Sequence, residues 1–271
     1  MPIREPYRPR PPAREFEEIR RQNPHWPQVL AEGDSWFAHP TEWNILFHLL
    51  DRGGFAIRRL ASVGDELAEM LNDVGGRTPQ YLKKLQSRRF RWRALLFSGG
   101  GNDLLGKPLK PMLRDRREVS HWRDCLIDQV LDAELAKLRS LFEELIEQTD
   151  QERPGLPILV HGYDYPFPRD KGATLFWGAL TVTGPWMYPV MKDKRHIEDR
   201  EEQRKLVSIL IDRLNDEVLA GLDADHASFH HIDLRGTLPS VRQWSDEIHP
   251  KSSGFKRMAR AYRRKLVELL A

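Results

Sequence analysis

A serine, an aspartate and a histidine stand where they could carry out acyl transfer. Ser35 lies in a GDSW sequence, and Asp246 and His249 lie three residues apart in a DEIH sequence near the other end of the chain. A serine hydroxyl attacks a carbonyl poorly unless an imidazole takes its proton, and a carboxylate must orient that imidazole. Because Pro250 keeps His249 out of a helix, we expect a turn that joins the carboxylate to the ring and points the other ring nitrogen at Ser35.

The same chemistry needs hydrogen-bond donors aimed at the oxyanion of the tetrahedral intermediate. Losing one such donor typically costs about 3 to 4 kcal/mol. The Ser35 N–H, near a helix start, can supply the first donor. The Gly64 N–H can supply a second because no side chain blocks the approach of substrate, and the Asn102 side-chain amide can supply a third. We therefore predict an oxyanion hole made of Ser35, Gly64 and Asn102.

Short apolar runs that alternate with longer amphipathic stretches must position these residues. The expected strands span residues 29–31, 56–60, 94–97, 158–160 and 230–234. The expected helices span residues 13–22, 44–51, 66–73, 120–148, 197–220 and 252–270. This alternation predicts an α/β fold with a parallel sheet that is covered by helices on both faces. Ligands bind beyond the carboxyl ends of such strands, where the candidate residues lie.

Four short blocks resemble the conserved blocks of the SGNH, or GDSL, hydrolases. They are GDSW at 33–36, SVGDE at 62–66, GGND at 100–103 and DEIH at 246–249. The similarity runs from about Val29 to the carboxyl terminus. It implies a flavodoxin-like, three-layer α/β/α sandwich around a mostly parallel five-stranded sheet, and an enzyme that hydrolyses carboxylic esters of the lipid or acylated-carbohydrate type.

The resemblance also implies a role for each matched residue. Ser35 would be the nucleophile and one oxyanion donor, Gly64 and Asn102 the other donors, and His249 the base that Asp246 orients. The chemistry is metal-independent, and no cofactor is expected. Trp36 stands where the family has leucine, a difference that concerns the substrate more than the chemistry.

Residues 163–192 interrupt the alternation of strands and helices. This segment holds seven aromatic residues and four prolines, and neither helical nor strand periodicity is present. A long irregular segment of this kind could be a lid or a substrate wall, or a flap that only covers the sheet edge. The expected substrate pocket combines aromatic residues of this segment with residues that follow the strands. From the segment come Tyr163, Trp177 and Trp186, and from the strand ends come Trp36, Asp103 and His161.

Composition and motifs argue against several other functions. Lys and Arg number 43 against 40 Asp and Glu, a near balance that does not fit a dedicated nucleic-acid binder. The single cysteine, Cys125, excludes a disulfide framework and a cysteine-based zinc site. The glycines at 99–101 lack the third glycine of a dinucleotide-binding loop, because residue 104 is leucine. The strand expected at 230–234 puts His230 and His231 on opposite faces, which disfavours a metal site.

The sequence predicts one domain preceded by a short arm, with neither a membrane helix nor a secretory signal. Five prolines in the first twelve residues predict an arm over residues 1–24, partly ordered, before a single domain over residues 25–271. No run approaches the roughly 18 apolar residues of a membrane helix, and no secretory signal is present. The default expectation is a cytoplasmic protein, with export by a signal-free route left open, and the oligomeric state is unreadable.

Two functions from different classes remain after these exclusions. The first is a serine esterase that forms an acyl-enzyme on Ser35. The alternative is a catalytically silent protein of the same fold, whose crevice and aromatic insert bind a glycan, a lipid or a protein. Labelling of Ser35 by a fluorophosphonate separates the two, because only an activated serine reacts.

Overall fold

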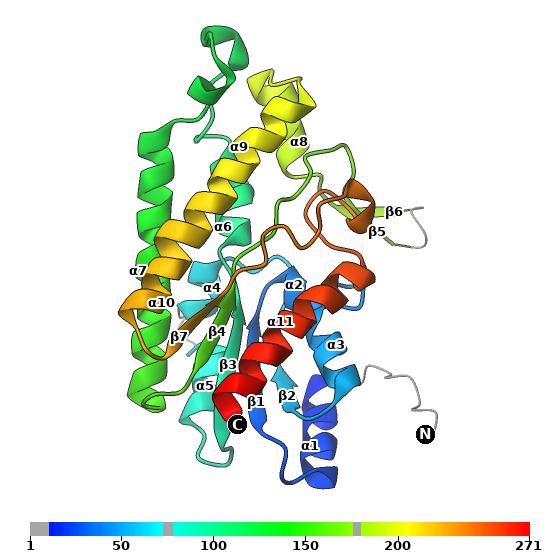
Figure 1. Ribbon diagram of the computed structural model, residues 1–271, viewed down its shortest axis with the longest axis vertical. Coiled ribbons are helices and arrows are strands. Elements are labelled where there is room, and N and C mark those ends of the chain that lie inside the picture. The colour runs from blue at the N-terminus through cyan, green and yellow to red at the C-terminus, as the bar shows by residue number, and fades with distance from the viewer. Residues whose placement is uncertain (1–10, 73–77, 176–179) are drawn as a thin grey trace.

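A five-stranded parallel sheet forms the centre of the protein, in a computed structural model that describes residues 11–72, 78–175 and 180–271 (Figure 1). The strands, in their order across the sheet, are β2 (Ala56–Arg59), β1 (Gln28–Gly33), β3 (Trp92–Ser98), β4 (Ile158–His161) and β7 (Phe229–Ile232). All four neighbouring pairs are parallel. The predicted sheet is confirmed, and the end of each strand lies within two residues of its expected position.

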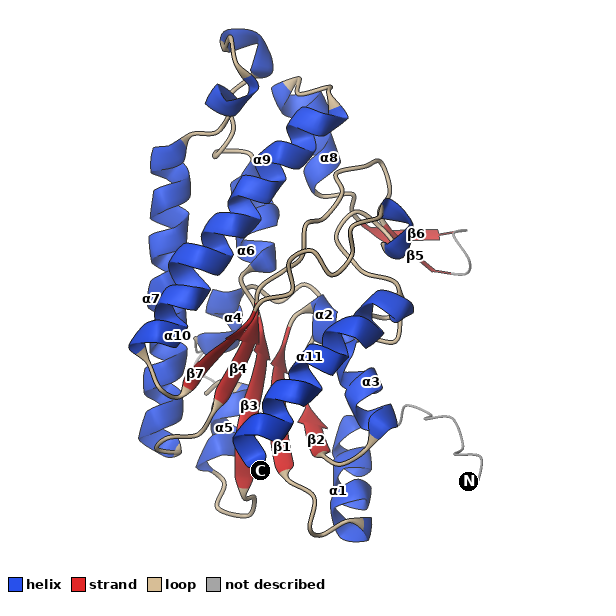
Figure 2. Cartoon of the chain, viewed as in Figure 1, coloured by secondary structure: helices blue, strands red, loops and turns tan. Residues whose placement is uncertain are grey.

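Helices cover both faces of this sheet, which confirms the predicted three-layer arrangement (Figure 2). One side carries α3 (Ile45–Arg52) and α11 (Ser252–Leu270), and α1 (Pro12–Gln22) packs against the edge strand β2. The other side carries α4 (Leu67–Leu71), α5 (Gln80–Gln86), α7 (Asp128–Glu152), α9 (Arg200–Arg213) and α10 (Ala220–Asp225). The central strands are buried on both faces, as a covered parallel sheet requires.

The longest helix begins later than its apolar spacing predicts. The prediction placed it at residues 120–148, but α7 begins at Asp128, after a single 3-10 turn over Trp122–Cys125. The backbone just before α7 pairs with another segment instead: the Ile127 N–H donates to the Met112 carbonyl at 2.8 Å, and the Arg114 N–H donates to the Cys125 carbonyl at 2.7 Å. These bonds use backbone groups that a longer helix would need for itself.

The helix expected at residues 197–220 is confirmed with different ends. Its first turn begins at Arg200 because the Asp199 carboxylate accepts from the N–H groups of Glu201 and Glu202, at 2.7 and 2.9 Å. Such a capping carboxylate ends the preceding loop and begins the helix. The helix continues through a π-helical turn over Leu214–Leu219 into α10.

Two short segments follow the carboxyl ends of β1 and β3. They are α2 (Ser35–Ala38) and α6 (Gly101–Leu105), which begin within the GDSW and GGND blocks. The helix start expected near Ser35 is confirmed as α2, whereas α6 and α5 were not expected as helices. Segments of four to seven residues are too short for helical periodicity to be visible.

The aromatic segment at 163–192 contains regular structure, contrary to the prediction. It holds an antiparallel pair, β5 (Ala173–Leu175) with β6 (Leu180–Thr183), and the single turn α8 (Met187–Pro189). Strands of three and four residues are too short to leave a period in the sequence. These elements lie above the carboxyl ends of the strands in Figure 1, on the side of the molecule where the sequence predicts the site.

The helix expected at residues 13–22 is confirmed as α1, and it packs against the rest of the protein. Phe16 is buried, and its ring lies 5.5 Å from that of Trp92 on β3. Glu15 forms an ion pair of 2.8 Å with Arg59 at the end of β2. The remaining part of the predicted arm, residues 1–10, lies outside the described residues, and a boundary at residue 24 stays a prediction.

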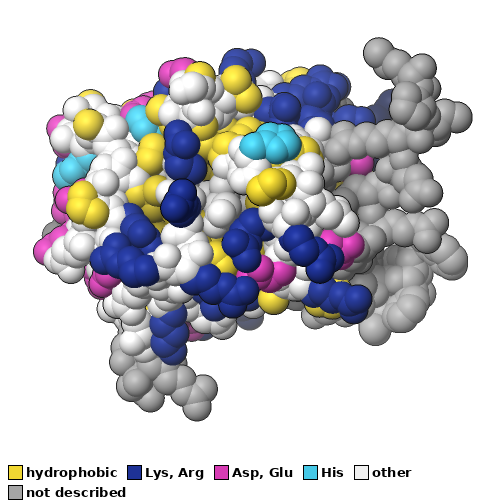
Figure 3. All heavy atoms as spheres, turned by 90° about the horizontal axis from the view of Figure 1, so that it is seen from below, with side chains coloured by type: hydrophobic (Ala, Val, Ile, Leu, Met, Phe, Trp, Pro, Cys, Tyr) yellow, Lys and Arg dark blue, Asp and Glu magenta, His cyan; other side chains and the backbone are white. Residues whose placement is uncertain are grey.

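The end of the molecule opposite the strand carboxyl ends is rich in charge. Figure 3 shows Lys and Arg side chains there, spread among fewer acidic ones. On α1, Glu17 pairs with Arg20 at 2.7 Å and with Arg89 at 2.9 Å. Within the part of the chain that the structure describes, each helix is too short or too polar to cross a bilayer.

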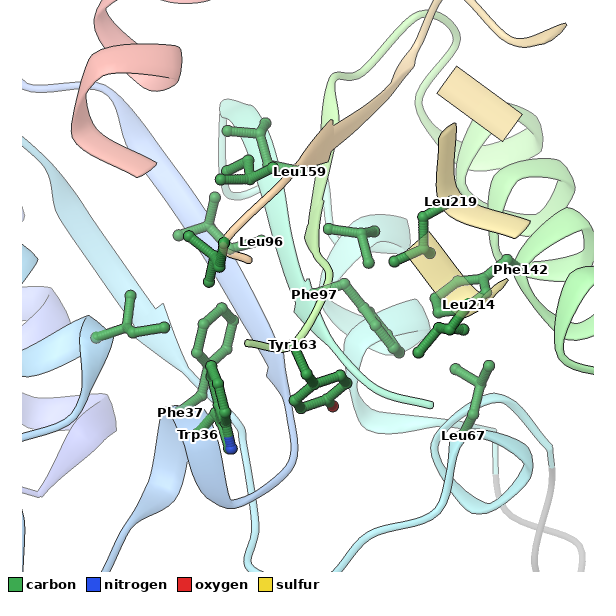
Figure 4. Packing of buried hydrophobic residues seen from close by; sticks show 14 of the residues in the cluster. Trp36, Phe37, Leu67, Leu96, Phe97, Phe142, Leu159, Tyr163, Leu214 and Leu219 are labelled. Atoms are coloured by element: carbon green, nitrogen blue, oxygen red, sulfur yellow. The ribbon is translucent and has the colours of Figure 1, made fainter. Parts of the chain in front are cut away.

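Aromatic side chains fill the core just beneath the carboxyl ends of β1 and β4. Figure 4 shows Trp36, Phe37 and Tyr163 lying together beside the sheet. The Trp36 ring meets the Tyr163 ring edge-on at 4.9 Å and stacks on His161 at 5.1 Å. Trp36 is only 3% exposed. Trp36, the position at which the GDSW block departs from the SGNH pattern, is therefore a core residue.

Candidate active site

Ser35 occupies a tight turn between β1 and α2. A Cβ on Gly33 would lie 2.6 Å from the Ser98 Cβ on the neighbouring strand, so only glycine fits at the end of β1. The next residue, Asp34, caps α2: its Oδ1 accepts from the Trp36 N–H at 2.9 Å. Ser35 is thus the first residue of a helical turn, where its N–H has no intrahelical acceptor.

Ser35, His249 and Asp246 form a continuous hydrogen-bonded chain, although 214 positions separate the serine from the histidine. The Ser35 Oγ lies 2.7 Å from the His249 Nε2, and the His249 Nδ1 lies 2.7 Å from the Asp246 Oδ2. The exposed fractions of the serine, the histidine and the aspartate are only 5%, 3% and 1%. The structure thus brings together the three side chains that the sequence predicts to interact.

The DEIH turn locks the carboxylate in place. Asp246 Oδ1 accepts from the Ile248 N–H at 2.9 Å and from the His249 N–H at 2.7 Å. Burial alone would raise the pKa of Asp246, but the hydrogen bond from His249, with the two backbone donors, holds that pKa below its usual value. An ionised carboxylate requires a proton on Nδ1 of the ring. Nε2 is then free to accept from the Ser35 hydroxyl.

A second histidine, His39, lies against the first. Their ring centroids are 4.7 Å apart at 73°, and His39 is buried. His39 Nδ1 accepts from the N–H groups of Thr41 and Glu42, at 3.2 and 2.9 Å, so the ring proton must sit on Nε2. Burial, followed by the proximity of His249, lowers the pKa of His39 to about 3. His39 is therefore neutral at physiological pH.

His39, Asp246 and His249 lie close enough together for a metal site, with one possible ligand atom of each within 4.8 Å of the others. A metal needs a free lone pair on each ligand. On His39, two backbone donors occupy the lone pair of Nδ1, and Nε2 carries the proton. Asp246 and His249 are already bonded to each other. The hydrogen-bond pattern of this cluster does not fit a metal.

A second Ser–His–Asp network lies beneath the first. Ser98 Oγ is 2.6 Å from Asp34 Oδ1 and 2.8 Å from His161 Nε2, and the Tyr163 hydroxyl donates to Asp34 Oδ2. Here the carboxylate contacts the serine instead of the imidazole, so the order of groups differs from that of a catalytic triad. Ser98 and His161 are completely buried, and burial lowers the pKa of His161 to about 4.

This second network holds the residue that precedes Ser35. Asp34 uses one oxygen for the Trp36 N–H and Ser98, and the other for Tyr163. Because these donors come from β3 and from the segment after β4, they fix the Asp34 carboxylate to the sheet. The turn that carries the Ser35 hydroxyl is fixed with it.

Ser35 opens onto a narrow pocket with about 420 Å³ of empty space, including its open mouth. The residues that line it are Asp34, Ser35, Trp36, Gly101, Asn102, Leu105, Gly106, Tyr163, Asp164, Pro166, Trp186 and Ile248. Of the expected oxyanion donors, Ser35 and Asn102 therefore share one pocket. The Asn102 amide donates one bond to the Asp65 carbonyl at 2.9 Å and has a second N–H.

Gly64 lies one residue before that carbonyl. It is exposed with φ of +85°, and it is not part of the pocket lining. The bond between Asn102 and Asp65 nevertheless ties the loop of Gly64 to the start of α6. An oxyanion role for the Gly64 N–H stays a prediction.

The residues expected in the substrate pocket divide into three groups. Trp36, Tyr163 and Trp186 line it. Asp103 and His161 do not: both oxygens of Asp103 accept from the Leu67 N–H, at 3.2 and 3.0 Å, so this carboxylate caps α4, and His161 belongs to the buried network. Burial raises the pKa of Asp103 to about 6. Trp177 lies outside the described residues.

Sequence reasoning gave four residues around the site no part in it: Asp34, which it considered only as a possible helix cap, and His39, Ser98 and Glu247. Two of them have a visible signal, because Asp34 lies inside the GDSW block and Glu247 inside the DEIH block. Ser98 and His39 have none. Their partners lie 64 and 210 positions away in the chain, at Asp34 and His249, so only the folded chain reveals their contacts.

Comparison with known proteins identifies the fold. No protein-family model and no curated protein matches the sequence. The lipase Lip_vut3 from a goat rumen metagenome matches the structure with a TM-score of 0.55 and 16% identity, over 88% of this chain and 96% of that one. An extracellular lipase from Streptomyces rimosus matches with a TM-score of 0.53 and 16% identity, over 88% and 99%.

A protein from Bacteroides ovatus described as a GDSL-like lipase matches with a TM-score of 0.50 and 12% identity, over 90% of this chain. This chain spans about half of that protein, 53% of its length. The fold is thus the SGNH-like α/β/α fold of these lipases, as the four sequence blocks predict.

Proposed function

We propose that this protein is a metal-independent serine hydrolase that cleaves carboxylic esters through an acyl-enzyme on Ser35. One observation carries the proposal: His249 bridges the Ser35 hydroxyl and the Asp246 carboxylate with two contacts of 2.7 Å at an apolar pocket. The fold of the GDSL-like lipases supports it. The substrate would be an ester of the lipid or acylated-carbohydrate type.

In the first half of the reaction, Ser35 Oγ attacks the ester carbonyl carbon while His249 Nε2 takes the hydroxyl proton. The carbonyl oxygen becomes an oxyanion, which the Ser35 N–H and the second Asn102 N–H would stabilise, with the Gly64 N–H as a third donor. The carbon–oxygen bond to the alcohol then breaks, and His249 returns its proton to the leaving alkoxide. Asp246 stabilises the transient imidazolium without taking its proton.

In the second half, water replaces the alcohol. His249 Nε2 takes a proton from the water, whose oxygen attacks the acyl carbon. The bond to Ser35 Oγ breaks, and the proton passes to this oxygen, which restores the free serine and releases the carboxylic acid. Because His39 remains neutral next to His249, it adds no positive charge that would oppose formation of the imidazolium.

A fluorophosphonate labels only an activated serine, so it tests the proposal directly. We expect one label on the folded protein, located on Ser35 by peptide mass spectrometry, and none after heat denaturation or in Ser35→Ala. A label on Ser98 would assign the nucleophile to the buried network instead. A folded protein that stays unlabelled and cleaves no ester would refute the hydrolase and favour a silent binding protein of the same fold.

A further inference from the structure

Glu247 joins the DEIH turn to the aromatic insert. Its carboxylate is completely buried and accepts from three consecutive backbone N–H groups at the start of α8. The Trp186 N–H donates at 3.0 Å, the Met187 N–H also donates to Oε1, and the Tyr188 N–H lies 3.2 Å from both oxygens. A buried carboxylate with three donors is a strong, directional attachment. It lies between Asp246 and His249 in the sequence.

The beginning of the insert is attached to the same turn. The Phe167 N–H donates to the Glu247 carbonyl at 3.1 Å, and the Glu247 N–H donates to the Lys171 carbonyl at 3.2 Å. The Arg169 guanidinium donates to the Asp246 carbonyl at 2.7 Å. Residues on both sides of the β5–β6 hairpin are therefore tied to the turn that carries the acid and the base.

These attachments place one aromatic side chain next to the reacting groups. The Trp186 ring meets the His249 ring edge-on, with centroids 5.6 Å apart, and it lines the pocket beside Ser35. The backbone also approaches this ring closely, because a Cβ on Gly184 would lie 2.6 Å from the Trp186 ring. Trp186 is thus held by Glu247 through its own N–H and confined by Gly184.

The rest of the pocket is apolar in effect. Asp164 looks like a polar exception, but it accepts from three backbone N–H groups, those of Tyr165, Gly236 and Leu238, at 2.6 to 2.8 Å. The Tyr163 hydroxyl likewise donates to Asp34. A ligand therefore meets mainly hydrocarbon and aromatic surface, to which Leu105, Pro166, Trp186 and Ile248 contribute. No Lys or Arg is among the lining residues that the structure describes.

We propose that this pocket binds the apolar, uncharged acyl chain of the ester, and that Glu247 determines the accepted chain length by holding Trp186 as one wall. The inference rests on the proposed esterase function. Glu247 is a positioning residue: it touches no reacting atom and acts through Trp186. The Tyr163 hydroxyl and the Asp164 carboxylate are already hydrogen-bonded within the protein, so few polar groups remain to bind sugar hydroxyls in this pocket. A sugar would have to bind outside the pocket, as the alcohol part of the ester.

A series of p-nitrophenyl esters from acetyl to dodecanoyl tests this inference through kcat/KM ratios. One methylene in a hydrophobic pocket changes kcat/KM by roughly tenfold or more. We therefore expect Trp186→Ala to raise the ratio of long-chain to short-chain kcat/KM by at least about tenfold. Glu247→Ala, which removes the acceptor of all three N–H groups, should shift the ratio in the same direction but less, and the double variant should match Trp186→Ala.

Two further variants keep the test sharp. Gly184→Ala puts a methyl group against the Trp186 ring without changing Glu247, so it should also change the ratio. Asp199→Ala is the matched control: it removes a carboxylate that likewise accepts from backbone N–H groups, at the capping residue of α9 and away from the pocket lining, and should leave the ratio unchanged.

Fluorophosphonate labelling separates this inference from the proposed function. If the folded parent protein is unlabelled, the esterase proposal fails. If it is labelled, but Trp186→Ala has the parental chain-length ratio, the pocket assignment is wrong. If Trp186→Ala shifts the ratio and a folded Glu247→Ala does not, the role of Glu247 is wrong. Should Glu247→Ala not fold, Glu247→Leu makes the same test, because it keeps most of the side-chain volume but offers the three N–H groups no acceptor.

Discussion

Replacing Asp246 by asparagine should reverse the tautomer of His249 while preserving the shape of the site. Asp246 Oδ1 accepts from two backbone N–H groups, at 2.9 and 2.7 Å. An amide nitrogen cannot accept from them, so the oxygen of the introduced amide must keep this position. The amide nitrogen then faces His249 Nδ1 in place of Oδ2 and donates to it. The ring proton must move to Nε2, where it blocks transfer from the Ser35 hydroxyl.

We expect this exchange to lower kcat/KM by about 10⁴-fold, equivalent to about 5 kcal/mol of transition-state stabilisation. The assay is hydrolysis of an activated ester together with the rate of fluorophosphonate labelling, because both reactions need the same proton transfer. Asp199→Asn serves as the control for the carboxylate-to-amide change. Thermal melting should show a folded variant, because the two backbone hydrogen bonds survive. A loss of less than tenfold in the folded variant would refute the tautomer argument.

Three other outcomes follow from the same structure. His249→Ala should reduce turnover of an activated ester by about 10⁴-fold or more, and parental turnover in the folded variant would contradict its role as the base. Tyr163→Phe removes the hydroxyl donor of Asp34 and should lower the free energy of unfolding, measured in urea, by about 1.5 to 3 kcal/mol; unchanged stability would show that this bond contributes nothing. Burial raises the pKa of Glu32 from 4.5 to about 7, because the folded protein disfavours the charged carboxylate. Below pH 4.5 Glu32 is protonated in both the folded and the unfolded state and does not lower stability. As the pH rises from 4.5 through 7, the unfolded state loses the proton first, and the free energy of unfolding falls. Glu32→Gln should therefore stabilise the protein at pH 8, by up to roughly 3 kcal/mol, and hardly at pH 4.5; an equal effect at both pH values would contradict this.

The sheet and the hydrogen-bonded serine, histidine and aspartate were predictable because their signals are local. A buried parallel strand must be a short apolar run, so Val29, Ala94 and Ile158 mark their strands without further information. The capping and turn residues of the GDSW and DEIH blocks likewise act over two or three positions, as the contacts of Asp34 and Asp246 show.

Contacts between distant segments decided the remaining features. The late start of α7 depends on pairing with residues 112–114, and the helical turn α8 depends on the carboxylate of Glu247, about sixty positions away. No periodicity encodes such pairings, because each partner gains its hydrogen bond only after the chain has folded.

The amino-acid sequence by itself determined the order of strands and helices and the identity of the serine, histidine and aspartate. Only the tertiary structure decided that Ser98 and His161 support the Ser35 turn from within the core, that Asp103 caps a helix, and that Trp186 stands beside His249. The physical reason is burial. A polar side chain removed from water must find its partner wherever the fold supplies one, and that partner can come from any part of the chain.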